Sequence, residues 1–315
     1  MSYAPIVIFI YNRSAELKLM LEMLQNCVGF DQSPIIVFGD GPKRQDQKEN
    51  VEKARQTARE ALGTRAEYRF NSLNKGLANS LIDGVTSVVS EYGSAIVLED
   101  DLYLAPSFLS FVNGALLRYA DDEHVFMVSG HNHDIPEFKD KTEAVLLPIT
   151  TTQGWGTWNR AWQQFDRSAM GSQNLFHSRS LQYRFNLDSS YDYATMLKRQ
   201  LRGKGNSWGI LWYWTVFKKD GLTVFPPQTL VYNIGMNDAG TNGYGRFRKF
   251  ASSYDPSGKT FSNIVNSFPQ AKTDDKDFQD YKNTIWRLNG GYLGYVVDKA
   301  KQVKLWLDSI GSSVK

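Results

Sequence analysis

The stretch Ala95-Ile96-Val97-Leu98-Glu99-Asp100-Asp101-Leu102 decides how the rest of this chain is interpreted. A short apolar run that follows Gly93 and ends abruptly in acidic residues is typical of a buried parallel strand. Its acidic end is then expected at the carboxyl edge of a sheet, where open α/β folds bind ligands. Adjacent carboxylates repel one another there unless a cation lies between them. A solvated acidic turn is the alternative interpretation. The neighbouring segments of the sequence are the evidence that distinguishes it from a ligand-binding strand end.

Bulk composition is that of a globular protein with one large domain or two modest ones, since 315 residues with 42% hydrophobic content can bury an ample core. A net charge of +3 is too small to indicate a nucleic-acid partner. The single cysteine, Cys27, excludes an internal disulfide framework and fits a reducing compartment. The first residues lack the features of a signal peptide, and no apolar run approaches the roughly 20 residues that span a bilayer. We therefore expect a cytoplasmic protein, either soluble or peripheral at the inner face of a membrane.

Apolar runs and helical spacings alternate along the first part of the chain. Strands are expected at 6–10, 35–38, 66–70, 95–98 and 125–130, and helices at 17–28, 43–62, 77–89 and 108–116. Asn12 or Ser14 is expected to cap the first helix. This alternation predicts an α/β fold with a mostly parallel, doubly wound sheet. The polar residues that follow the strands would then share one edge of the sheet.

The second part of the chain is less regular. Strands are expected at 145–148, 223–225 and 230–232, and helices at 191–201 and 210–217, with residues 166–190 irregular. The glycine-tryptophan stretch 153–158 is interpreted as a loop that exposes at least one ring. Residues 251–280 are expected to be loosely folded, and an amphipathic helix is expected around 292–307, docked on the protein itself or on a membrane surface.

Three polar segments have competing interpretations. Asp40, between two glycines, favours a tight turn or, alternatively, a carboxylate that accepts a ring N–H or a ribose hydroxyl. His131, His133 and Asp134 favour a polar turn over a metal site, because no third His or Cys lies nearby. The loop 235–245 contains four glycines and precedes Arg246 and Arg248, so it is either a lid that closes on an anion or a disordered surface loop.

Several of these stretches, in the same order, resemble a glycosyltransferase of the GT-A fold, specifically the N-acetylglucosaminyltransferase I-like group. The resemblance covers roughly residues 4–245. It is carried by Pro5-Ile6-Val7-Ile8 with Asn12-Arg13-Ser14, by Ile35-Ile36-Val37 with Asp40, by Val97-Leu98-Glu99-Asp100-Asp101-Leu102 with Ala105-Pro106 and Phe108, by Val128-Ser129 with Asn132, and by Gly154-Trp155. The acidic motif is the specific part, and the other stretches support it.

The resemblance implies transfer of a sugar from a nucleotide donor, usually a UDP-sugar, with a divalent metal such as Mn²⁺ or Mg²⁺ and with inversion at the anomeric carbon. Arg13 and Asp40 would hold the uridine, Asp100 would face the ribose and sugar, and Asp101 would be the direct metal ligand. We also assign Tyr11, Asn74, Lys75 and Glu99 to the nucleotide-sugar site. Residues 1–125 would form the nucleotide-sugar-binding half, residues 126–250 the acceptor-binding half with its lid at 235–245, and residues 251–315 a partly helical extension.

One position departs from the family's pattern. The family places its catalytic base, an aspartate, directly after a tryptophan at the start of a late helix, where this chain has Trp208-Gly209. Glycine cannot accept a proton, and inversion needs a base within hydrogen-bond reach of the acceptor hydroxyl. Asp238 is the first substitute candidate, and Asp192 and Asp134 follow. Trp155 and Trp208 are assigned to the acceptor site.

The leading hypothesis is an inverting, metal-dependent glycosyltransferase that extends a glycan or lipid-linked glycan in bacterial surface polysaccharide synthesis. A non-catalytic protein of the same fold that binds a nucleotide sugar is a second hypothesis, because of Gly209. A nucleotidyltransferase is a third, but its usual glycine-rich loop after the first strand is missing from Tyr11-Asn12-Arg13.

Overall fold

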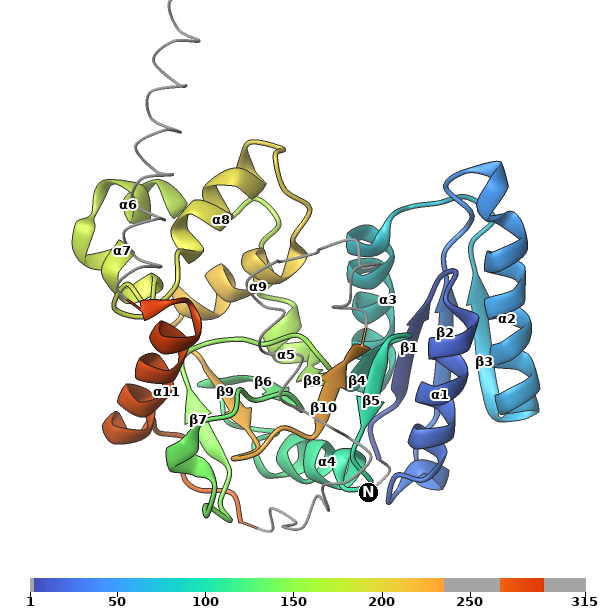
Figure 1. Cartoon of the computed structure of the whole chain (residues 1–315), viewed down its shortest axis with the longest axis horizontal. Helices are drawn as coiled ribbons and strands as arrows, with labels where there is room; N and C mark the ends of the chain where they lie inside the picture. Colours follow the sequence, from blue (N-terminus) through green and yellow to red (C-terminus); the bar gives the residue numbers. More distant parts are fainter. Residues whose placement is uncertain (1–2, 235–266, 292–315) are drawn as a thin grey trace, which may run out of the picture.

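A computed structural model describes residues 3–234 and 267–291, and an eight-stranded sheet with the order β3-β2-β1-β4-β8-β6-β9-β7 runs through its centre (Figure 1). β1 pairs in parallel with β2 and β4, and β2 pairs in parallel with β3. β8 lies antiparallel between β4 and β6, so β6 and its parallel neighbour β9 run in the same direction as β4. The mostly parallel α/β sheet predicted from the sequence is confirmed.

The first half alternates strand and helix, as predicted. Its elements are β1 (Ile6–Ile10), α1 (Ser14–Gln25), β2 (Ile35–Gly39), α2 (Lys48–Leu62), β3 (Ala66–Phe70), α3 (Leu77–Tyr92) and β4 (Ser94–Glu99). The β-branched runs of β1, β2 and β4 form the inner strands because they bury both faces. The predicted cap of α1 is wrong: Arg13 occupies the N-cap position, and its side chain, which has no acceptor, donates to Asp101.

The second half contributes the rest of the sheet and a group of helices. Its elements are β5 (Leu102–Leu104), α4 (Phe108–Arg118), β6 (Val125–Ser129), β7 (Val145–Leu147), β8 (Trp155–Trp158), α5 (Asn159–Trp162), α6 (Ser172–His177), α7 (Arg179–Phe185), α8 (Tyr193–Leu201), α9 (Trp208–Phe217), β9 (Leu222–Phe225), β10 (Val231–Asn233) and α11 (Asp275–Leu288). β5 and β10 form a separate antiparallel pair.

Three predictions for this half are wrong. The stretch 153–158 is not a loop, because Trp155–Trp158 form β8 between two strands and all four residues are buried. Residues 166–190 contain the short helices α6 and α7 rather than irregular chain. α11 begins within the region expected to be loosely folded, and its buried Tyr281 and Ile285 belong to the protein's core. The predicted helix at 292–307 and the predicted lid at 235–245 lie outside the described residues.

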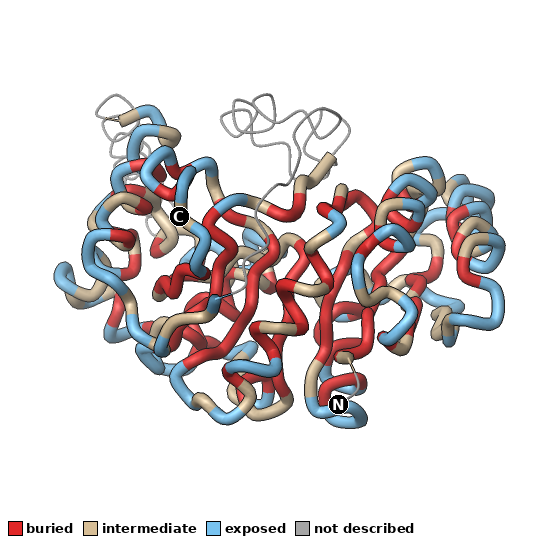
Figure 2. The backbone as a smooth tube through the Cα atoms, turned by 90° about the horizontal axis from the view of Figure 1, so that it is seen from below, coloured by how far each residue is buried: buried red, intermediate tan, exposed pale blue. Residues whose placement is uncertain are grey.

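Two hydrophobic clusters hold the fold together. The larger one fills the space between the sheet and helices α1 to α4, and Figure 2 shows its buried residues along the centre of the molecule with exposed residues on the outer helices. The smaller one unites the helices α7, α8, α9 and α11 through side chains such as Phe185, Leu197, Tyr213 and Tyr281. Within the parts of the chain that the structure describes, no helix combines the length and the apolarity needed to cross a membrane.

Candidate active site at the acidic end of β4

The acidic cluster, which we define as Glu99, Asp100 and Asp101, lies where β4 ends. β1 and β4 are parallel neighbours, so the residues that follow β1 lie beside it. The backbone N–H of Tyr11 donates to Oδ2 of Asp100 at 3.0 Å. Nη1 of Arg13 lies 2.5 Å from Oδ2 of Asp101, and Nδ2 of Asn233 donates to Oδ1 of Asp101 at 3.1 Å. Three segments far apart in the sequence therefore meet at these carboxylates.

The electrostatics of the cluster are those of buried, crowded acids. Burial, with smaller contributions from the charges of Asp101 and Asp100, raises the pKa of Glu99 to about 8. Burial likewise raises the pKa of Asp100 to about 7, with a second contribution from Asp101. Burial also raises the pKa of Asp101, although the guanidinium of Arg13 opposes it. In the described parts of the chain, Arg13 is the one cation that pairs with the cluster, and it does not balance three carboxyl groups. The cluster therefore has the excess of acidic groups that a cation-binding site needs.

The cluster fits a hard divalent cation in its chemistry, with one constraint. Mg²⁺ and related ions are commonly bound by one or two protein carboxylates and complete their coordination with substrate phosphates and water. No group of three His, Cys, Asp or Glu side chains suited to a metal occurs in residues 3–234 and 267–291, so a site made of protein ligands alone is not formed there. Both oxygens of Asp101 already accept hydrogen bonds, from Arg13 and Asn233. A cation at Asp101 would therefore have to share this carboxylate with Arg13 or displace it.

Arg13 thus lies in the predicted site, where its guanidinium contacts the carboxylate of Asp101. Its side chain is 26% exposed, so its guanidinium is reachable from solvent. Tyr11, the other predicted residue after β1, directs its hydroxyl towards Gln47, to which it donates at 2.7 Å, and accepts from the N–H of Lys43 at 2.9 Å. The residues after β1 therefore connect the acidic cluster to the segment that begins α2.

Asp40, at the end of β2, organises the neighbouring loop. Its carboxylate accepts from the backbone N–H groups of Gly41, Lys75 and Gly76 at 2.8 to 3.1 Å. Asn74 closes the same loop, because its Nδ2 donates to the carbonyl of Gly41 at 2.7 Å. These contacts correspond to the turn-forming interpretation of Asp40. Lys75 directs its ammonium group outwards to Asp83, with Nζ 3.6 Å from Oδ2.

The residues predicted for the acceptor side include Trp208, which lies in the first turn of α9. Ser207 caps this helix by accepting from the N–H of Ile210 at 3.4 Å. A Cβ atom built on Gly209 would lie 3.6 Å from Oγ1 of Thr152, which is an ordinary van der Waals distance. Thr151 joins the same segment to the end of β6, where its Oγ1 lies 2.6 Å from Oγ of Ser129. The position after Trp208 therefore has room for a side chain, but the sequence has glycine there.

Trp155 and Trp208 are core residues. They are 1% and 7% exposed, and their rings pack against each other, tilted by 31°, with centroids 5.4 Å apart. Trp162 and Trp212 extend the same aromatic cluster. The expected exposure of a ring in the stretch 153–158 is wrong because β8 is inserted inside the sheet. An acceptor sugar could reach these rings only after a rearrangement of the core.

The candidate bases do not converge on the acidic cluster in the described structure. Asp192 is the N-cap of α8 and accepts from the N–H of Thr195 at 3.2 Å. Asp134 is exposed in the loop after β6, and Asp238 lies outside the described residues. His131 and His133 pack edge to face with centroids 5.1 Å apart, and burial lowers their pKa values to about 3 and about 4. Neutral, packed rings agree with the polar-turn interpretation.

Sequence reasoning missed Asn233. This residue ends β10, whose antiparallel pairing with β5 places it beside Asp101, and the backbone N–H of Ile234 donates to the carbonyl of Asp101 at 2.9 Å. β10 itself was predicted, but β5 was not. The apolar, aromatic stretch Leu102-Tyr103-Leu104 was the available signal.

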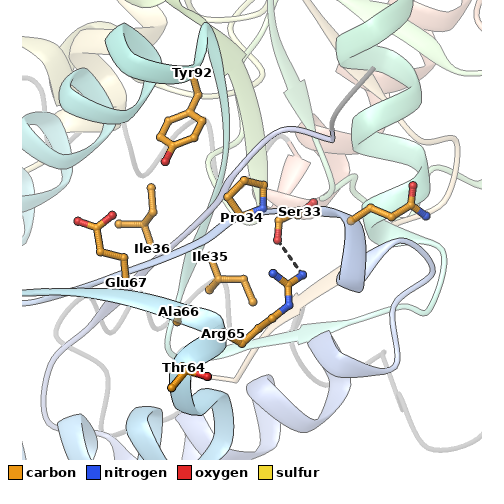
Figure 3. Close-up of a pocket in the computed structure, with 10 residues that line it drawn as sticks. Ser33, Pro34, Ile35, Ile36, Thr64, Arg65, Ala66, Glu67 and Tyr92 are labelled. Carbon is orange, nitrogen blue, oxygen red and sulfur yellow. Dashed lines mark hydrogen bonds between the residues drawn. The ribbon is translucent and has the colours of Figure 1, made fainter.

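A shallow pocket lies at the opposite edge of the sheet, where β2 and β3 begin (Figure 3). Its lining residues are Gln32, Ser33, Pro34, Ile35, Ile36, Thr64, Arg65, Ala66, Glu67 and Tyr92. Arg65 extends towards Ser33 and donates from Nη2 to its carbonyl at 3.0 Å (Figure 3). None of the sequence-predicted site residues lines this pocket.

No protein-family model and no curated protein matches the chain. Solved structures share part of its architecture. A fragment of S. aureus TarS overlaps with a TM-score of 0.42 and 11% identity over 75% of this chain and 61% of the fragment. The mannosyltransferase PcManGT from Pyrobaculum calidifontis, in complex with GDP-Man and Mn²⁺, overlaps with a TM-score of 0.36 and 10% identity over 69% of this chain and 73% of that one. This chain spans about three fifths of the length of the TarS fragment.

Proposed function

We propose that this protein is a metal-assisted, inverting glycosyltransferase that moves a sugar from a UDP-sugar to a glycan acceptor. The observation that carries the proposal is the acidic cluster, in which Asp100 and Asp101 are buried and Glu99 is half-buried at the carboxyl edge of a mostly parallel sheet. All three carboxyl groups have raised pKa values, and among the described residues Arg13 is the cation paired with them. Buried carboxyl groups with strongly perturbed pKa values are candidates for a functional site. The ordered resemblance of the flanking motifs to the N-acetylglucosaminyltransferase I-like group supports the same assignment.

Residues of this chain would have separate roles in binding the donor and the cation. Asp101 would hold a divalent cation, Mn²⁺ or Mg²⁺, which neutralises the charge of a leaving diphosphate when it is bound. Asp100, anchored by the N–H of Tyr11, would face the ribose and sugar of the donor. Arg13, once released from Asp101, would be free to pair with the donor, since guanidinium groups bind phosphate oxygens in a bidentate manner. Asp40 would keep the loop at Asn74 and Lys75 in place beside the nucleoside.

Deprotonation of the acceptor is the step for which the described residues offer no obvious base. Asp238 remains our first candidate, and Asp192 is disfavoured because its carboxylate caps α8. The same gap at Gly209 favours the second candidate function, a protein that binds a nucleotide sugar without transferring it. We place the enzyme at the cytoplasmic side of a membrane, in the synthesis of a surface polysaccharide, with glycan or lipid-linked glycan as acceptor.

Release of UDP from a panel of UDP-sugars, with Mn²⁺ and with a chelator, tests the proposal. We expect turnover that requires the metal and that falls at least about a hundredfold in Asp101→Asn, because the variant lacks the carboxylate that would hold the cation opposite the leaving diphosphate. Asp46→Asn, which removes an exposed carboxylate from the turn before α2, is the matched control and should leave turnover unchanged. Stabilisation by UDP and Mn²⁺ without turnover of any donor would support the non-catalytic alternative, and neither stabilisation nor turnover would refute both.

A further inference from the structure

Positive charge is concentrated in one part of this chain. Residues 166–220, which include helices α6 to α9, contain nine lysines and arginines, four aspartates and no glutamate, although the whole chain has a net charge of only +3. The rest of the molecule is therefore slightly acidic. Such an asymmetry gives one region an electrostatic field that attracts anions.

The four aspartates of this region are already engaged. Asp166 lies 2.9 Å from Nζ of Lys218, Asp220 lies 3.1 Å from Nη2 of Arg184, and Asp188 pairs with Lys282 of α11. Asp192 caps α8. The acids of this region therefore compensate other cations and a helix end.

The surplus of positive over negative side chains is greatest in the basic segment, which we define as residues 198–204 at the end of α8. Lys198, Arg199, Arg202 and Lys204 are all exposed. None of the four forms an ion pair with any residue in the two described ranges, 3–234 and 267–291. Lys198 and Arg199 lie in the last turn of α8, where the helix dipole favours cations, but Arg202 and Lys204 lie beyond the helix and lack that explanation.

The basic segment has a defined shape. The N–H of Gly203 donates to the carbonyl of Gln200 at 3.1 Å, and the N–H of Lys204 donates to the carbonyl of Arg199 at 2.9 Å. Oε1 of Gln200 then accepts from the N–H of Ser207, the N-cap of α9, at 2.7 Å. The cations are therefore carried by a turn that is folded back onto α8 and tied to α9.

These contacts connect the basic segment to the acceptor side of the candidate site. Ser207 begins the helix whose second residue, Gly209, approaches Thr152, and the adjacent Thr151 is bonded to Ser129 at the end of β6. In the view of Figure 1, α8 and its connection to α9 lie above the sheet. A long acceptor that enters the site beside α9 would pass the basic segment.

We propose that the basic segment binds an anionic acceptor, namely a glycan chain that carries phosphodiester or carboxylate groups. This inference rests on the proposed function, because it names the acceptor class of the same site. Four cations within seven residues match a chain of repeated anions better than a single one, and arginine pairs well with both phosphate and carboxylate. The exposed part of the segment has no aromatic side chain on which a nucleic-acid base could stack.

A membrane surface fits the segment less well. Interfacial helices need a continuous apolar face as well as cations. α8 buries its apolar residues Ala194 and Leu197 in the protein, and Leu201 is the exposed apolar residue within the basic segment. The anionic glycan is therefore the occupant that we infer.

Three labelled polymers distinguish the possible ligands: polyphosphate, polygalacturonate and neutral dextran, each titrated by fluorescence anisotropy against the full chain. We expect binding of one or both polyanions that weakens steeply with salt, and none of dextran. Comparison of polyphosphate with polygalacturonate identifies the preferred anion. Vesicles of phosphatidylcholine with about 30% phosphatidylglycerol test the membrane alternative, and tighter binding to them than to either polyanion would overturn the proposal.

The decisive comparison uses two variants with equal loss of charge. Arg199→Gln/Arg202→Gln/Lys204→Gln removes three cations of the basic segment, and Lys18→Gln/Lys48→Gln/Lys53→Gln removes three exposed lysines from α1 and α2. We expect the first variant to bind polyanion at least about tenfold more weakly and the second to bind nearly as well as the wild type. Equal losses in both would show attraction by net charge alone and would overturn the proposal.

Two further measurements keep the test independent of folding and of the proposed function. The double variant Arg202→Gln/Lys204→Gln leaves α8 unchanged and should already lose part of the affinity. Thermal stabilisation by UDP and Mn²⁺ should be the same in the triple variant and the wild type. If UDP and Mn²⁺ fail to stabilise the wild type, the donor assignment fails, whereas unchanged polyanion binding in both basic-segment variants rejects the acceptor inference.

Discussion

Arg13 and Asp101 show how much a single contact changes the interpretation of a motif. The acidic motif alone suggests an open carboxylate ready for a metal ion. In the structure, Asp101 is paired with Arg13 and hydrogen-bonded to Asn233. Burial is the main cause of the raised pKa values of Glu99 and Asp100, and the charge of Arg13 opposes it only in part.

The acidic cluster predicts an unusual dependence of stability on pH. The ordinary pKa values of 4.5 and 3.8 apply to Glu99 and Asp100 in the unfolded chain, whereas the folded values are about 8 and about 7. Between these limits the folded state binds more protons than the unfolded chain does, so the contribution of these groups to stability falls as pH rises from about 4 to about 8. We expect a decrease of about 1 kcal/mol or more, measured by urea unfolding followed by tryptophan fluorescence.

Glu99→Gln is the matched variant for this prediction. It removes one of the two raised groups, so its stability should fall less steeply than that of the wild type over the same pH range. Mn²⁺ should stabilise the wild type more at pH 8 than at pH 5, because protons compete with the cation for the carboxylates. Identical pH profiles for wild type and Glu99→Gln would contradict the assignment of the slope to this cluster.

Gly209 offers a second test at the residue scale. Because a Cβ atom fits there at 3.6 Å from Thr152 and an acid near a helix N-terminus is favourable, Gly209→Asp should fold with a stability within about 1 kcal/mol of the wild type. If the chain lacks an efficient base, the new carboxylate should raise turnover by up to about a hundredfold. Steady-state UDP release measures this effect. Gly209→Asn, which cannot accept the proton, should show no such gain.

At the scale of elements, β8 is a strand that the sequence analysis interpreted as a loop. Gly154-Trp155-Gly156-Thr157-Trp158 has the glycine content of a loop, yet the strand is held by pairing with β4 and β6 on either side. Gly156 allows α4 to approach the sheet, since a Cβ atom there would lie 2.9 Å from Cγ1 of Val112. The glycine that suggested a loop is required by helix packing.

Two glycine-to-alanine substitutions should therefore have opposite effects. Gly156→Ala should destabilise the protein by about 1 to 3 kcal/mol, because the methyl group overpacks the contact with α4. Gly209→Ala should be neutral or slightly stabilising, because the site is open and alanine favours a helix. Thermal and urea unfolding of both variants, side by side, measure the difference. A larger loss in Gly209→Ala than in Gly156→Ala would contradict this account of the β8–α4 contact.

Some elements of the fold could be predicted from the sequence and others could not, because only some of them have a local sequence signal. β1 to β4 and their helices were predicted because β-branched runs and helical spacings are local signals. α6 and α7 were missed because they have only six and seven residues and little periodicity. In the candidate site, the meeting of Tyr11, Arg13 and the acidic cluster follows from parallel strands that share one edge. The contact with Asn233 could not be predicted, because it depends on a pairing between β5 and β10 across a long stretch of chain.

At the scale of the whole molecule, the predicted boundary at residue 125 does not separate two folding units. β4 belongs to the first half, yet it pairs with β8 from the second half along four residues. A fragment of residues 1–125 would expose this edge together with Ile96 and Val97, which are buried in the full chain. We expect the fragment to aggregate or to remain without fixed tertiary structure, as judged by sedimentation and by hydrogen exchange.

The full chain is the control for that experiment. An Ile96→Lys variant of the fragment tests whether the exposed edge of β4 causes the aggregation. If exposure of the β4 edge drives aggregation, the added charge should improve solubility without giving a folded sheet. A soluble wild-type fragment with slow amide exchange in β1, β2 and β4 would show that the first half folds by itself.

The insertion of one reversed strand, β8, into the middle of the sheet has a consequence for how this scaffold can diversify. The segments proposed to bind donor and acceptor are joined through that strand. Exchanging either half with another protein would therefore remove its pairing and disrupt the packing of the core. New specificities must then arise by single substitutions at the rim and in the turns, where the central layer is not disturbed.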